Sequence, residues 1–588
     1  MLIAYGKFNK LVYRHLLFYY LINEKVRMTK LVEVYLDPYY GHEFDSRHFH
    51  QNKRGNKMKR SIFASIGDVN KLKSNKTRLK LILFSIIIGF LTGIVVVLYR
   101  VSLDKIVIIR NEIMGFNIGL LLFLFFISAI IIQFLLNKFP LISGSGIPQV
   151  EGVLNRQITF NWFFEIVNKF FAGVLAIFMG LSLGREGPSI HLGALMADGV
   201  NSTSNRPDVE RKYLLSSGAS AGLAAAFNAP LSGTIFALEE LKKFFSPILL
   251  ICTLLASISS NLVVQYFLGR NVVLSHFITA NPMGNTIKDI SFEIFLVLIL
   301  SFFMAISAKL FNYCLIKSLN IYRDIKLNKY IKMIIVSIIS FFAVYFMPDI
   351  TGGGHSLIEK LILSQTAFKV VILLLLFKFI FTMFSYSTGA AGGIFLPLLV
   401  LGALIGKVYG IVIVNLFNLS DAYLIHFMLL SMAAYFSAIV KAPITGIVLI
   451  LEMTGNFSNL FSLTIAAAFS YIISDLIKNE GVYDLLYHRM FEKNLKEYEN
   501  DEEIKPSNKM TAIRLAVIEN SKLAGMFIKD VNWPKNMLVI GIERNNYEFI
   551  PDGNTKIYEG DQIIIFADDN IVVKKLHELF EMTREDVK

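Results

Sequence analysis

Charged side chains are scarce in this sequence. They make up 18% of its 588 residues, whereas 54% of the residues are hydrophobic. A soluble chain of this length carries about 25% charged residues, and a larger core would not account for so wide a gap. The composition therefore argues against a water-soluble enzyme and predicts a protein that lies in a lipid bilayer.

Cysteine is almost absent as well. Cys252 and Cys314, the two in the chain, both lie in apolar runs, where cysteine is typical as a small buried hydrophobe. A disulfide framework is therefore excluded. The histidines and carboxylates at 42–50 lack a recognised metal-ligand spacing, so they indicate a solvated tail. We expect neither a metal nor a cofactor, and no nucleophile–base arrangement or phosphate-binding loop indicates an enzyme.

The basic excess is concentrated near the N-terminus. The formal net charge is +13, and much of it lies between Lys53 and Lys80, ahead of the first long apolar run. A basic flank beside a first membrane helix favours a cytoplasmic N-terminus, which explains the charge without nucleic-acid binding. The apolar run at 16–22 is too short, and its flanks too charged, for a cleavable signal peptide. Residues 1–78 are predicted to form a basic cytoplasmic tail.

From residue 81 to about residue 477, apolar runs alternate with short polar breaks. A bilayer-spanning helix needs about 20 residues, and the runs long enough are 81–99, 116–136, 162–183, 246–268, 292–314, 331–347, 369–385 and 421–440. Shorter segments, interrupted by glycine and proline, lie at 186–200, 214–240, 352–364, 393–416 and 441–453. Because membranes tolerate broken helices only where the backbone faces protein or a water-filled cavity, this pattern indicates a transport path.

The apolar region also repeats itself, with an offset of about 210 residues. The segment 227–239 aligns with 440–452, since both contain Ala-Pro and end in Leu-Glu. The segment 184–188 aligns with 393–397, and a Gly-Ala-Leu triplet follows each of them. Matched broken-helix segments in two halves are typical of a binding site formed at the interface between repeats.

Three segments place glycine and proline at the start of a helical run, at 144–148, 184–188 and 393–397. Proline is favoured in the first helical turn, and glycine lets the backbone approach a ligand closely. The N–H groups and the positive dipole end of such a helix bind anions without a full basic charge. The alternative is that the glycines allow close helix packing. Three segments of the same form favour an anion site.

These segments resemble the signature motifs of the CLC family of chloride channels and chloride/proton antiporters. The motifs are Gly-Ser-Gly-Ile-Pro at 144–148, Gly-Arg-Glu-Gly-Pro at 184–188 and Gly-Ile-Phe-Leu-Pro at 393–397, and the similarity covers about residues 80–490. The resemblance implies an all-α polytopic membrane protein with an inverted repeat and broken helices, which we place at 79–490. It further implies a homodimer with one path in each subunit.

The resemblance also implies the anion ligands: the hydroxyl of Ser145, the backbone N–H groups of Ile394 and Phe395, and the phenol of Tyr483. Of these, Tyr483 is assigned by its position rather than by a long motif. The turns themselves complete the expected anion site, with Gly146, Ile147, Gly184, Arg185 and Gly187.

Glu186 is the expected gate and proton carrier. A carboxylate within the membrane is costly, and desolvation favours its protonated form, while its ionised form can occupy the anion site as a tethered competitor. The alternative is a salt bridge to Arg185, but adjacent residues on a helix do not face each other. Glu240 aligns with the internal proton-transfer glutamate of the antiporters, although pairing with a following lysine would also explain it. Glu239 and Glu151 match buried structural acids of the family.

The resemblance favours chloride as the anion, because serine at Ser145 matches the chloride-type pattern and the motifs of the fluoride-exporting branch differ. We therefore predict coupled chloride/proton antiport. The alternatives are a voltage- or ligand-regulated passive chloride channel, which would use the same anion site, and a regulatory or cation-transport protein. A cation path would need carbonyl rings or acidic side chains, and no filter-like sequence is present.

A charged linker at 491–508 precedes a separate small α+β domain at 509–588, with short β-branched runs at 511–519, 537–543 and 562–567 bounded by turn residues. This domain resembles the TrkA-C module, also called RCK-C, of prokaryotic ion-transport regulators. The resemblance implies dimerisation, a regulatory role and a small nucleotide ligand such as cyclic di-AMP. It also implies a prokaryotic plasma membrane, with both termini cytoplasmic.

Overall fold

The computed structural model describes residues 75–155, 157–204, 208–243, 245–269, 286–363 and 366–490, and in the C-terminal part 510–517, 523–531, 533, 537–544, 547–558 and 561–568. These residues form two compact units, a helical one and a smaller C-terminal one. The predicted tail at 1–78, except for its last four residues, and the predicted linker at 491–508 lie outside the described residues.

The helical unit consists of two halves with corresponding helices. The first half contains α3 (Asn75–Phe116), α4 (Ile118–Lys138), η2 (Pro140–Ile142), α5 (Ile147–Leu154), α6 (Trp162–Phe178), α7 (Glu186–Thr203), α8 (Asp208–Phe227), α9 (Pro230–Phe236), η3 (Ala237–Leu241) and α10 (Pro247–Leu268). The second contains α11 (Ile287–Asp324), α12 (Lys329–Phe346), η5 (Pro348–Ile350), α13 (His355–Leu363), α14 (Phe368–Ser387), α15 (Phe395–Phe417), α16 (Ala422–Val440), α17 (Pro443–Thr454) and α18 (Leu460–Leu476). A last helix spans 482–490.

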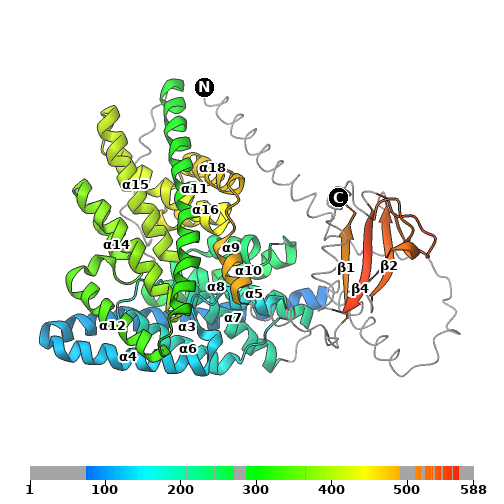
Figure 1. Cartoon of the computed structure of the whole chain (residues 1–588), viewed down its shortest axis with the longest axis horizontal. Helices are drawn as coiled ribbons and strands as arrows, with labels where there is room; N and C mark the ends of the chain where they lie inside the picture. Colours follow the sequence, from blue (N-terminus) through cyan, green and yellow to red (C-terminus); the bar gives the residue numbers. More distant parts are fainter. Residues whose placement is uncertain are drawn as a thin grey trace. The chain divides into compact units, whose positions relative to one another are not determined.

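The two halves pack in the same way. In the first half α7 packs on α8 and α3 packs on α10, and in the second α15 packs on α16 and α11 packs on α18. Helices α9 and α17 contact each other and so join the halves. In Figure 1 the first half runs from blue to teal and the second from green to gold. The internal repeat predicted from the sequence is therefore present in the helix packing.

Eight helices of the described residues are long and apolar enough to cross a membrane. They agree with seven of the eight predicted long runs, and two predictions about length were wrong. The run at 162–183 ends as a helix at Phe178, because the chain then leaves the helix on its way to the turn at Gly184. The segment at 393–416 forms a continuous helix, because its glycines accommodate α16: a Cβ on Gly402 would lie 3.0 Å from Met432 Cα.

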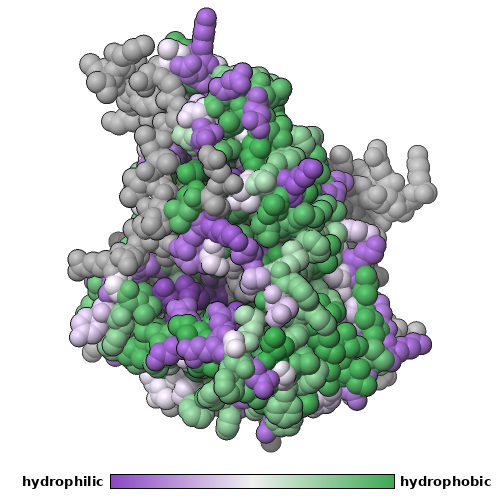
Figure 2. All heavy atoms as spheres, turned by 90° about the vertical axis from the view of Figure 1, so that its left-hand side faces the viewer, coloured by the Kyte–Doolittle hydropathy of each residue, from purple (hydrophilic) through white to green (hydrophobic). Residues whose placement is uncertain are grey.

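Large apolar side chains are exposed on the outer helices of this unit. Examples are Phe90 on α3, Phe123 on α4 and Phe342 on α12, each more than half exposed. Figure 2 shows one face of the molecule, where hydrophobic side chains cover broad areas and hydrophilic side chains gather in a hollow. A soluble monomer rarely exposes such areas, whereas lipid accommodates them, so this unit is a multi-pass membrane protein.

The C-terminal unit is built on a four-stranded antiparallel sheet with the order β1-β4-β2-β3. The strands are β1 (Met510–Ala516), β2 (Met537–Arg544), β3 (Tyr547–Phe549) and β4 (Gln562–Asp568). Ile563 and Ile565 alternate along β4 and enter the core with Ile542 and Ile557. The three predicted strands are confirmed, and the short β3 was missed because three residues are too few for a recognisable alternation.

Candidate functional site

Two glycine-bearing turns, one from each half, are hydrogen-bonded to each other. The N–H of Gly184 donates to the carbonyl of Gly393 at 2.7 Å, and the N–H of Gly393 donates to the carbonyl of Gly184 at 2.8 Å. Helix α7 begins two residues later at Glu186, and α15 begins at Phe395. Two helix N-termini, each with unsatisfied N–H groups and a positive dipole end, therefore start from one point.

The third turn joins them. The N–H of Gly144 donates to the carbonyl of Gly389, and the N–H of Gly392 donates to the carbonyl of Gly144, both at 3.0 Å. Ser145 is buried, and a Cβ added to Gly187 would lie 2.8 Å from the Ser145 Cβ. The backbones of these two turns are therefore in direct contact. All three turns predicted to form the anion site meet in the structure.

Ser145 is oriented by its neighbours. Its Oγ accepts a hydrogen bond from the N–H of Ile147 at 3.3 Å, and Gly146, in the left-handed region with φ 89°, caps helix α5. The phenol of Tyr386, on α14, lies within hydrogen-bonding reach of both the backbone and the side chain of Ser145. The Ser145 hydroxyl thus lies at the N-terminus of α5 and beside the bridge between α7 and α15.

A buried lysine holds this turn in place. The Nζ of Lys169, on α6, donates to the carbonyls of Ile142 and Gly144, both at 2.7 Å, and the side chain is fully buried. The sequence analysis missed Lys169 and Tyr386. Lys169 could have been found from the repeat, because a second lysine, Lys378, follows at the spacing of 209 residues that also separates Gly184 from Gly393. Tyr386 could not have been found in this way, since nothing in the sequence distinguishes it from the other aromatic residues of its apolar run.

Glu186 points into the meeting point of the turns. Its side chain is buried, and its carboxylate lies within hydrogen-bonding reach of its own N–H and of the Leu396 N–H in the first turn of α15. Its Oε2 has no hydrogen-bond partner among the described residues. Arg185 instead forms an ion pair with Asp104 of α3 at 3.6 Å. The Glu186 carboxylate therefore occupies a position where a helix N-terminus would hold an anion.

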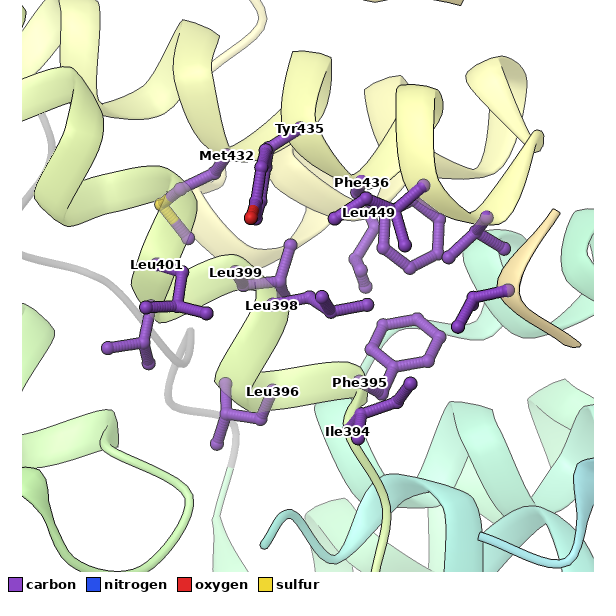
Figure 3. Close-up of a cluster of buried hydrophobic side chains, with 14 of the residues drawn as sticks. Ile394, Phe395, Leu396, Leu398, Leu399, Leu401, Met432, Tyr435, Phe436 and Leu449 are labelled. Atoms are coloured by element: carbon purple, nitrogen blue, oxygen red, sulfur yellow. The ribbon is translucent and has the colours of Figure 1, made fainter. Parts of the chain in front are cut away.

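The side chains of the second-half motif anchor the backbone. Ile394 and Phe395 are fully buried, and the Phe395 ring lies 4.7 Å from the ring of Phe436 and 5.9 Å from that of Phe236. Figure 3 shows both residues at the edge of the apolar cluster between α15, α16 and α17. Because these side chains are held in the core, the N–H groups of the first turn of α15 are fixed in direction.

Tyr483 lies on the last helix, at 482–490, and reaches the same region. It is fully buried, its ring meets the Phe236 ring edge-on at 6.5 Å, and its hydroxyl has no partner among the described residues. The phenol interacts electrostatically with Tyr386, Glu240 and Glu186. An unpartnered buried hydroxyl is rare in a folded protein, and this one is within electrostatic range of both glutamates predicted to carry protons.

The adjacent glutamates of η3 have different surroundings. Glu239 accepts hydrogen bonds from the N–H groups of Ile444 and Thr445 and from the Thr445 hydroxyl, at 2.8–3.1 Å, and so caps α17. Glu452, its counterpart, caps α9 in the same way. Glu240 is buried and has no comparable cap among the described residues. Glu239 therefore links the two halves by capping α17, whereas Glu240 does not take part in this contact.

Fold and site together define a multi-pass membrane protein in which two matched halves bring helix N-termini together at buried, glycine-bearing turns. The family model described as "Voltage gated chloride channel" matches residues 125–475, and the "TrkA-C domain" model matches residues 512–580. The chain belongs to this chloride channel family, the CLC family, and carries a C-terminal TrkA-C domain.

Curated relatives are similar along the helical unit. The H(+)/Cl(-) exchange transporter ClcA of Vibrio cholerae serotype O1 (strain M66-2) is 30% identical over 445 residues, which cover 73% of this chain and 93% of the relative. A solved structure of a slow cyanobacterial Cl−/H+ antiporter is 24% identical, with a TM-score of 0.66, and the match covers 71% of this chain and 99% of that one. A CLC-type fluoride/proton antiporter, also 24% identical, has a TM-score of 0.58, over 70% and 98% of the two chains. These two structures share the fold.

Proposed function

We propose that this protein exchanges chloride for protons across the membrane. Relatives named H(+)/Cl(-) exchange transporter support this proposal over most of the helical unit. So does the geometry, since the three turns with their helix N-termini meet around Ser145 and Glu186. A helix N-terminus binds an anion without a full basic charge, so it can also release it.

The position of the Glu186 carboxylate at the first turn of α15 carries the proposal. While ionised, the carboxylate takes the backbone N–H that would otherwise serve a chloride ion. When protonated, it loses the charge that the helix terminus favours, so chloride can replace it. One side chain thus excludes the anion and carries the proton, and the two movements are linked because they compete for one place.

We assign the remaining roles from the same arrangement. The Ser145 hydroxyl, the N–H groups of Ile394 and Phe395 and the Tyr483 phenol hold the anion. Glu240 passes protons between Glu186 and the aqueous phase on one side of the membrane. It suits this role because it is buried and acts electrostatically on the Tyr483 phenol, on which Glu186 also acts.

The test is proton movement driven by a chloride gradient in liposomes that contain the purified protein. The wild-type protein is expected to move protons against their gradient. Glu186→Gln is expected to abolish proton movement while chloride still passes, because the amide cannot ionise and cannot carry a proton. The control is Glu112→Gln, an exposed carboxylate on α3. A wild-type protein that passes chloride without protons would indicate a passive channel, and proton pumping by Glu186→Gln would refute the assignment of the gate.

We also propose that the TrkA-C domain regulates transport and that its ligand is a small nucleotide such as cyclic di-AMP. The family match of this domain supports a regulatory role. Calorimetric titration of the full-length protein with cyclic di-AMP tests the ligand, and an absence of heat would remove it from consideration.

Assembly and orientation complete the proposal: a homodimer in a prokaryotic plasma membrane, with both termini cytoplasmic. The basic residues ahead of α3 support this orientation. Large apolar side chains exposed on α10 and α18, such as Leu262 and Ile472, could be covered by a second subunit as well as by lipid. Cross-linking in the membrane tests the dimer, and labelling of terminal tags in intact cells tests the orientation.

A further inference from the structure

An ion pair links the element that carries Glu240 to the helix that carries Tyr483. Helix η3 ends at Leu241, and two residues on Lys243 adopts a left-handed backbone with φ 48°. Its Nζ donates to Oδ1 of Asp484, the residue that follows Tyr483 in the helix at 482–490. The Lys243 side chain is 45% exposed and that of Asp484 33% exposed, so this pair lies at the edge of the buried site.

Glu240 lies within the electrostatic field of this pair. The charged groups acting on it are Lys243, Asp484, Glu151 of α5 and its neighbour Glu239, and the Tyr483 phenol also interacts with it. Lys243 acts in turn on Glu240, Asp484 and Glu151. One ammonium group therefore faces several carboxylates. Because Lys243 is hydrogen-bonded to Asp484 and not to Glu240, its positive field at Glu240 is opposed by the adjacent aspartate.

We propose that the Lys243–Asp484 ion pair is a positioning pair that sets the pH range over which Glu240 exchanges protons with the aqueous side. This inference rests on the proposed function, in which Glu240 passes protons. An isolated ammonium group near Glu240 would favour its ionised form and delay proton uptake, whereas unopposed carboxylates would favour its protonated form and delay release. With both members of the pair present, the positive charge of Lys243 and the negative charge of Asp484 offset each other at Glu240, so neither its ionised nor its protonated form is strongly favoured by the pair.

The proposal makes two opposite predictions. Asp484→Asn leaves Lys243 unopposed, so the midpoint of proton-coupled exchange against pH shifts to lower pH. Lys243→Gln leaves Asp484 and Glu151 unopposed, so the midpoint shifts to higher pH. Each shift is expected to be about one pH unit, as for a unit charge about 10 Å away at an effective dielectric constant of about 20. The double variant is expected to return to within about a third of a unit of the wild type, because the two changes cancel.

The experiment measures chloride-driven proton movement by the full-length protein in liposomes, over a series of pH values, together with chloride movement. Lys243→Arg and Asp484→Glu keep the charges and are expected to keep the wild-type midpoint. The matched control is Asp349→Asn, which removes an ion pair with Lys360 of similar exposure on η5 and α13. A structural brace would lower the rate in both single variants without moving either midpoint.

Two unmoved midpoints, or two midpoints that move in the same direction, would overturn the inference while leaving the proposed exchange intact. If one single variant does not fold, the other still decides, since each predicts a shift of stated sign. An absence of proton movement in the wild-type protein is a separate outcome, which would overturn the proposed function and this inference with it.

Discussion

The two halves of the membrane unit hold their turns in place with the same devices. Lys169 donates to the carbonyls of Ile142 and Gly144, and Lys378 donates to those of Ile350 and Gly352 at 3.0 and 2.9 Å. Both lysines are fully buried. The glutamates at the ends of the 227–239 and 440–452 segments each cap a helix of the other half. The supporting contacts are therefore duplicated.

The chemistry is not duplicated. The position of Glu186 in the first half is occupied by Phe395 in the second, and the position of Glu240 is occupied by Met453. Both replacements are apolar and buried. At these two matched positions the first half thus has carboxylates and the second half has apolar side chains packed in the core. The repeat thus keeps its supporting contacts in both copies, while only one copy contains the two glutamates that we propose to carry protons.

The largest effect that would test this division is the loss of proton movement in Glu240→Gln. The amide cannot carry a proton, so proton movement is expected to fall below detection while chloride movement persists. Glu239→Gln is the matched control on the adjacent residue, because Glu239 is engaged in capping α17. It is expected to keep proton movement within about twofold of the wild type, since a twofold change is well under 1 kcal/mol. Both are measured by chloride-driven proton uptake in liposomes.

The division between the two glutamates would fail if Glu239→Gln also abolished proton movement at unchanged protein folding. It would fail equally if Glu240→Gln pumped protons at the wild-type rate. Either result would mean that burial and capping in η3 do not separate a proton-carrying residue from a structural one.

A smaller effect is expected from the two buried lysines. Lys169→Met and Lys378→Met each leave two carbonyls without their donor, and an unsatisfied buried group costs about 1–3 kcal/mol. Both variants are therefore expected to lower the melting temperature to a similar extent. Chloride transport is expected to fall about tenfold or more in Lys169→Met, because its carbonyls adjoin Ser145, and less than threefold in Lys378→Met, whose carbonyls do not.

Melting in detergent and chloride efflux from liposomes separate these two effects. Similar losses of stability with unequal losses of transport would support the view that both halves use a buried lysine to hold a turn, whereas only the turn held by Lys169 serves the anion path. Equal transport losses would show instead that both lysines serve the anion path directly, and the comparison between the halves would have to be revised.

The sequence predicted the membrane fold and the meeting of the three turns because both depend on features that are local and repeated. Glycine and proline mark the helix starts, and the repeat shows that matched segments belong together. Helix lengths were predicted less well, as in 162–183 and 393–416, because glycine within an apolar run can have two structural effects. It ends a helix where the chain must turn, and it brings a continuous helix close to its neighbour.

Side-chain contacts between distant segments outside these motifs could not be predicted. Nothing near Glu239 in the sequence indicates that its carboxylate accepts hydrogen bonds from Thr445, more than two hundred residues away. The ion pair of Arg185 with Asp104 is equally hidden, since it depends on how α3 packs on α7. Such partners follow from tertiary packing, which periodicity does not encode. The roles of the site residues remain predictions that the transport experiments above address.

The smallest expected effect concerns the two reciprocal caps. Glu239 and Glu452 each accept three hydrogen bonds at the N-terminus of a helix in the other half, where negative charge is favoured. Glu239→Gln and Glu452→Gln keep one oxygen acceptor and lose the charge, so each is expected to lower the free energy of unfolding by about 1–2 kcal/mol. Thermal unfolding of each variant measures the loss. The two losses should be equal if the halves are held symmetrically, and the double variant should lose the sum of both, because the caps share no donor. A loss confined to Glu239→Gln would show that the first half alone stabilises the contact between α9 and α17.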